Sequence, residues 1–118
     1  MKPALTLFAA LVAAPLAAQV SPSLTIEQRT GLRCSAAFAI AAQAQARGDA
    51  EALSLPPLAQ RGREFFVRFS AQLMDDTGMT RDEVAALLTT EARALSAAGG
   101  GLKQVMPACL MLLDAAGV

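Results

Sequence analysis

The chain has 118 residues, ten basic and ten acidic, with no histidine, tryptophan or tyrosine. This length suits a single domain, and the balanced charge excludes the usual nucleic-acid binder, which needs clustered Lys and Arg to displace counterions from phosphates. Because histidine is the commonest general base and the commonest zinc ligand, its absence disfavours most enzymes, and neither a metal nor another cofactor is expected.

Residues 1–18 have the pattern of a cleavable secretory signal peptide. A charged start at Lys2 precedes an apolar run over 4–14 and a small-residue stretch over 16–18, after which we expect cleavage. The apolar run is shorter than the ~20 residues that cross a bilayer, so no stable membrane insertion is expected once the signal is removed. The sequence thus predicts an exported protein that is periplasmic, or secreted.

The remainder is expected to form a short linker over 19–24 and one helical domain over 25–118. Thr25 is followed three residues later by Gln28, which is the spacing of a capping box at the start of a helix. Gly48 is expected to end this first helix, since glycine readily adopts the left-handed conformation that closes a helix.

A second helix is predicted over 58–77, after Pro56-Pro57. At about 100° per residue its larger apolar residues fall on one arc, which indicates a buried aromatic face. That face comprises Leu58, Gly62, Phe65, Phe66, Phe69 and Leu73, with Phe38 of the first helix as its expected partner.

A third helix is predicted over 81–98, opened by a second capping box and ended by glycines 99–101. The segment 102–116 is predicted as a fourth helix, with a kink or a fresh start at Pro107. Because no stretch shows the alternation of a strand, the expected fold is all-α, a small bundle of about four helices.

The two cysteines of an exported chain most simply form one disulfide. Cys34 lies on the apolar face of the first helix and Cys109 on that of the last, so a bond between them would join these two helices. A disulfide between chains remains an alternative. A redox-active pair is disfavoured, because the Cys-x-x-Cys spacing of exchange-competent thiols is missing.

Three polar features could form a functional site: the acidic turn around Gly78, the arginines of the second helix, and Glu91. The acidic turn around Gly78 does not match a calcium loop, because the ligand positions would fall on Leu73 and Val84. Arg61, Arg63 and Arg68 flank the phenylalanines and could bind an anion, but Glu64 stands three residues after Arg61 and four before Arg68, which favours a solvated face of ion pairs. Neither feature predicts a site.

Glu91 is the possible ligand-contacting residue. It projects between apolar positions of the third helix, and a buried carboxylate needs a partner. Glu91 either lies at the rim of the core, pairs with an arginine of the second helix, or contacts a ligand in a pocket between helices.

Segments 33–38, 62–66 and 106–110, which read RCSAAF, GREFF and MPACL, resemble small exported two-cysteine helical proteins of Gram-negative bacteria. The resemblance spans most of the mature chain and implies no activity, cofactor or catalytic residue.

The sequence therefore predicts a non-catalytic periplasmic module that binds a protein or a small apolar ligand. One alternative is a structural or oligomer-forming envelope protein, for which Val67 and Met74 are candidate contact residues. Another is an enzyme of an unrecognised type, although the usual nucleophile and base are hard to assemble from these residues.

Overall fold

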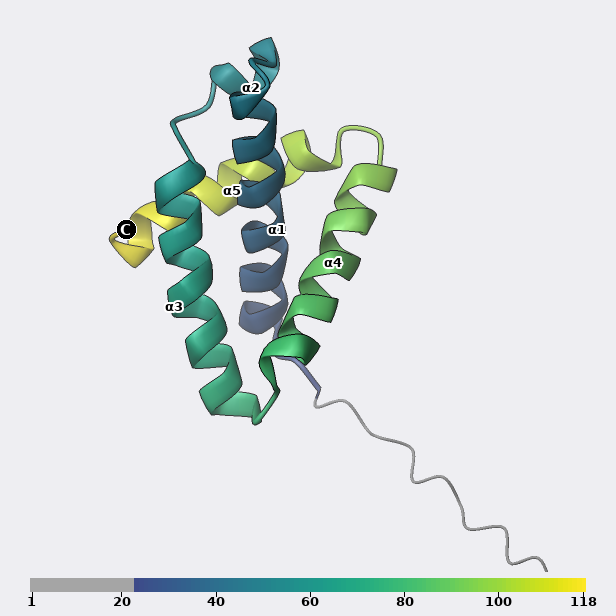
Figure 1. The fold of residues 1–118 in the computed structure, drawn as a ribbon, viewed down its shortest axis with the longest axis vertical. Coiled ribbons are helices and arrows are strands. Elements are labelled where there is room, and N and C mark those ends of the chain that lie inside the picture. Colours follow the sequence, from purple (N-terminus) through teal and green to yellow (C-terminus); the bar gives the residue numbers. More distant parts are fainter. Residues whose placement is uncertain (1–22) are drawn as a thin grey trace, which may run out of the picture.

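A computed structural model describes residues 23–118, so the predicted signal peptide 1–18 and residues 19–22 of the linker lie outside the described residues. The described chain forms five helices and no strand, which confirms the predicted all-α fold (Figure 1). The helices are α1 (Ile26–Ala46), α2 (Ala50–Leu53), α3 (Ala59–Thr77), α4 (Arg81–Ala97) and α5 (Gly101–Ala116).

Helix α1 lies at the centre of the domain and contacts all four other helices. Figure 1 shows α3 and α4 on either side of α1, with α5 running across them rather than along them. Much of the surface of α1 is buried, and its small residues let the neighbouring backbones approach closely. The buried small residues are Gly31, Ser35, Ala36, Ala37, Ala41 and Ala44.

The helix ends follow the local signals of the sequence. Thr25 and Thr80 each accept a hydrogen bond from the backbone three residues later and complete the predicted capping boxes. Gly48 and Gly78 have φ angles of 78° and 73°, the left-handed conformation expected at a helix end. Helix α5 continues through Pro107 without a fresh start.

The larger of two hydrophobic clusters, here the first cluster, surrounds a disulfide between Cys34 of α1 and Cys109 of α5. Both cysteines are almost fully buried, and their Cα atoms are 5.2 Å apart. The predicted pairing is therefore confirmed within the chain. The other buried members are Ala36, Ala37, Phe38, Ala41, Leu58, Phe65, Leu95, Met106 and Leu113.

The second cluster lies where the start of α1 meets the turn between α3 and α4. Its buried members are Leu32, Leu73, Met79 and Val84. Phe69 is partly buried and packs against both clusters, which makes its ring the link between the two halves of the interior.

Gln45 of α1 holds the connection between α2 and α3. Its Nε2 donates to the carbonyl oxygens of Ala52 at 3.1 Å, Leu55 at 3.4 Å and Pro56 at 2.8 Å, while its Oε1 accepts from the backbone N–H of Leu58 at 3.0 Å. One amide thus provides hydrogen bonds for an irregular segment that has few partners of its own. None of the helices over 23–118 combines the length and apolar character of a membrane span.

Candidate functional site

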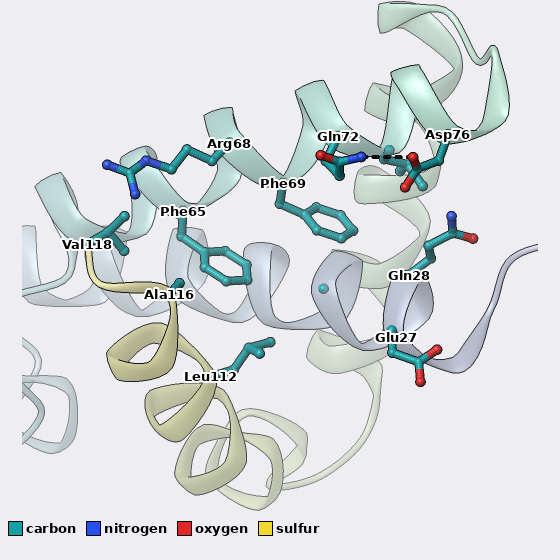
Figure 2. Close-up of a pocket in the computed structure, with 12 residues that line it drawn as sticks. Glu27, Gln28, Phe65, Arg68, Phe69, Gln72, Asp76, Leu112, Ala116 and Val118 are labelled. Atoms are coloured by element: carbon teal, nitrogen blue, oxygen red, sulfur yellow. Dashed lines mark hydrogen bonds between the residues drawn. The ribbon is translucent and has the colours of Figure 1, made fainter.

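A cavity of about 380 Å³ opens between α1, α3 and α5 (Figure 2). Apolar side chains of α3 and α5 form its interior, and polar side chains of α1 and α3 stand at its edges. It is lined by Glu27, Gln28, Gly31, Phe65, Arg68, Phe69, Gln72, Leu73, Asp76, Leu112, Ala116 and Val118. This combination of size and largely apolar lining is typical of small-molecule sites.

The aromatic part of the cavity comes from the predicted apolar face of α3. The Phe65 ring meets Phe38 edge to face, with centroids 5.4 Å apart, and is nearly parallel to Phe69 at 6.0 Å. Both arrangements are favourable for aromatic pairs. Phe38 is therefore the partner that the sequence predicted, and it fixes Phe65 from the side of the core.

Gly31 allows Phe69 to lie directly on the backbone of α1. A Cβ atom at position 31 would overlap the Phe69 ring. The glycine that looks like a weak point in the sequence of α1 is thus a site of close approach between two helices.

The polar groups of the cavity are divided between its two ends. Figure 2 shows Arg68 near Val118 at one end, and Glu27, Gln28, Gln72 and Asp76 toward the other. Gln72 Nε2 donates to Asp76 Oδ1 at 2.8 Å. The cavity therefore has a cationic end and an anionic end, separated by its aromatic interior.

A smaller cavity of about 270 Å³ lies between α1 and α3 on the side that faces α4. Its lining includes Phe38, Gly62, Arg63, Phe66 and Leu88. Gly62 packs against Phe38, because a Cβ at position 62 would stand 2.9 Å from the Phe38 Cβ. With a single charged side chain among its lining residues, this cavity offers fewer groups to orient a ligand.

Glu91, the residue proposed from the sequence to contact a ligand, is not among the lining residues of either cavity. Its side chain is 24% exposed, and its Oε2 lies 3.5 Å from Nε of Arg33. The arginine that faces it comes from α1 rather than from the second predicted helix, because α4 packs along α1 at this level.

The prediction that Glu64 forms ion pairs with Arg61 and Arg68 is wrong. Arg61 instead reaches α5, where its Nη2 is 2.7 Å from Asp114 Oδ1, and its Nε donates to a main-chain oxygen of Val118, beyond the end of α5, at 2.9 Å. Glu64 accepts a hydrogen bond from Gln60 at 3.5 Å. The spacing along one helix gave no indication that α5 would supply a closer carboxylate.

Across residues 23–118, no three His, Cys, Asp or Glu side chains gather closely enough to hold a metal ion. Cys34 and Cys109 are joined to each other and buried, so neither thiol is available as a nucleophile in this state. Comparisons of the chain with protein-family models, with curated proteins and with solved structures found no match.

Proposed function

We propose that this protein is an exported, non-catalytic module that binds a small apolar ligand in the cavity between α1, α3 and α5. The main support for this proposal is the lining of that cavity, in which Phe65, Phe69 and Leu112 form an apolar interior. A ligand placed there would cover apolar surface that now borders solvent, and burial of such surface is the main source of affinity for ligands of this kind.

The proposed location outside the cytoplasm is supported by two independent features. The disulfide lies inside the first cluster, and such bonds persist in oxidising compartments. The sequence of residues 1–18 resembles a signal peptide. We expect the protein recovered from the periplasm of an expressing bacterium to begin at Gln19, as measured by intact mass.

Ligand binding is tested with N-phenyl-1-naphthylamine, an uncharged dye whose fluorescence rises in apolar surroundings. The purified, disulfide-bonded protein should give a saturable increase with one dye per chain. Leu112→Trp places a larger side chain in the cavity and should weaken dye binding at least tenfold. Since the natural chain lacks tryptophan, the emission of this residue would also report its surroundings.

Met111→Trp is the matched control, because Met111 is the neighbouring residue on α5 but is 74% exposed and lies outside the cavity. It should leave dye affinity unchanged. Circular dichroism should show that both variants keep the helical content of the parent. If no saturable binding occurs, or if both tryptophan variants bind as the parent does, the proposed function is wrong.

A further inference from the structure

We infer that the ligand of this cavity is a small amphiphile with one anionic group, which binds at the Arg68 end. This inference rests on the proposed function and specifies the chemistry of its ligand. It is carried by the unequal distribution of charge around an apolar interior.

Arg68 is the cation of the cavity and has no ion pair within the described residues. Arg29, Arg63, Arg81 and Arg93 also have no ion pair in this part of the chain, but Arg68 is the arginine that lines this cavity. A guanidinium group presents a planar fork of donors that matches a carboxylate, a sulfonate or a phosphate. No Asp or Glu side chain of the described residues lies within 4 Å of the Arg68 guanidinium, so an anionic group at this edge could accept its hydrogen bonds.

The opposite end disfavours an anion. Glu27 and Asp76 carry negative charge there, and Gln72 already donates to Asp76. A ligand anion placed at that end would meet repulsion, whereas the same group at Arg68 would meet attraction. The charges therefore orient the ligand, with its anionic group at the Arg68 end and its apolar body toward Glu27 and Asp76.

The separation of the two ends limits the ligand's length. Arg68, Gln72 and Asp76 follow one another at intervals of four along α3, so they lie on one stripe of the helix. Eight residues at about 1.5 Å each span roughly 12 Å. Phe65, Phe69 and Leu112 line the apolar interior. A single anionic group joined to an apolar body of about that length fits this arrangement.

Three amphiphiles that share a ten-carbon chain test the inference by displacing N-phenyl-1-naphthylamine at pH 8: decanoate, 1-decanol and decyltrimethylammonium. The natural protein should bind decanoate more tightly than decyltrimethylammonium. Arg68→Gln should weaken decanoate binding roughly five- to tenfold, the effect expected for loss of one exposed charge-assisted contact, and should weaken decanol binding much less. Arg68→Glu should reverse the order of the two charged amphiphiles.

Arg93→Gln is the matched control, because it removes the same charge from an exposed position of α4 outside the cavity. It should bind all three amphiphiles as the natural protein does. If Arg68→Gln retains full decanoate affinity while Leu112→Trp still blocks the dye, the inference about the anion is wrong and the proposed function stands. If the dye does not bind saturably at all, the proposed function fails, and the inference fails with it.

Discussion

The two hydrophobic clusters of this domain are held together by different means. The first cluster contains a covalent bond between α1 and α5, and Gln45 adds hydrogen bonds to the connection beside it. The second cluster has neither, and side-chain packing and the capping box at Thr80 hold it. One end of the domain is thus fixed by a covalent bond between residues 75 positions apart, while the other depends on non-covalent contacts alone. We expect the second cluster to open first.

Removing the disulfide should have the largest effect on the free energy of unfolding. Non-covalent contacts alone would then hold both clusters. The bond joins residues 75 positions apart, for which the chain-entropy model gives about 4–5 kcal/mol as an upper figure. The double variant Cys34→Ala, Cys109→Ala leaves no unpaired thiol and should lower the free energy of unfolding by up to that amount in urea titrations. A loss below about 1 kcal/mol would contradict a dominant role for the bond.

Leu73→Ala should break the second cluster alone. Leu73 is 1% exposed, and deleting a buried leucine side chain costs about 2–5 kcal/mol. Hydrogen exchange should accelerate at the end of α3 and the start of α4, while amides near the disulfide keep their protection. Leu113→Ala, at a fully buried position of the first cluster, is the matched control and should accelerate exchange around α5 instead. Uniform acceleration in both variants would show that the clusters unfold as one unit.

Gln45→Leu should destabilise the connection between α2 and α3, which lies beside the first cluster, and leave the disulfide intact. The change leaves the Leu58 N–H and three carbonyl oxygens without their side-chain partner, at a cost of roughly 1–3 kcal/mol. Gln43→Leu makes the same exchange at an exposed position of the same helix and should be nearly neutral. Equal thermal midpoints for the two variants would exclude a structural role for the Gln45 amide.

Thr80→Ala should loosen the second cluster by a smaller amount. The Thr80 Oγ1 accepts from the Glu83 N–H at 3.2 Å, and loss of such a cap costs about 1 kcal/mol. Thr89→Ala, at an exposed position within α4, is the control. Exchange of the first amides of α4 should rise in the former variant only.

Glu91→Gln should have the smallest effect, although Arg33 stands between members of the two clusters, Leu32 and Cys34. The pair is 3.5 Å long and the Arg33 side chain is 54% exposed, and such surface pairs contribute about 0–1 kcal/mol. Dye affinity should also be unchanged, since Glu91 does not line the cavity. A loss of affinity in a folded variant would instead support the predicted contact between Glu91 and a ligand.

The sequence predicts the helices well because the signals that set their ends are local. The capping boxes at Thr25 and Thr80 and the glycines at 48 and 78 act within a few residues of one another. The disulfide could also be predicted from the sequence, since only one pairing exists within the chain and each cysteine lies on an apolar helix face.

The cavity and the long-range polar contacts could not be predicted from the sequence, because they depend on how the helices pack and how α5 crosses the others. Helical spacing relates a residue only to its own helix, so it suggested Glu64 as the partner of Arg61, where the fold supplies Asp114. The hydrogen bonds of Gln45 could not be predicted either, since its partners are backbone groups of an irregular segment. Arg68 was recognised as a surface cation, but its place beside an apolar cavity required the fold.

At position 31, one added methyl group would displace a ring that lines the cavity. Phe69 occupies the space that any larger residue there would need, and the Phe69 ring borders both the cavity and the two clusters. In Gly31→Ala the Phe69 ring would have to move from its present position against α1. Because this ring also lines the cavity, a natural variant with alanine at this site is expected to have the same fold with a differently shaped cavity, although no polar group has changed.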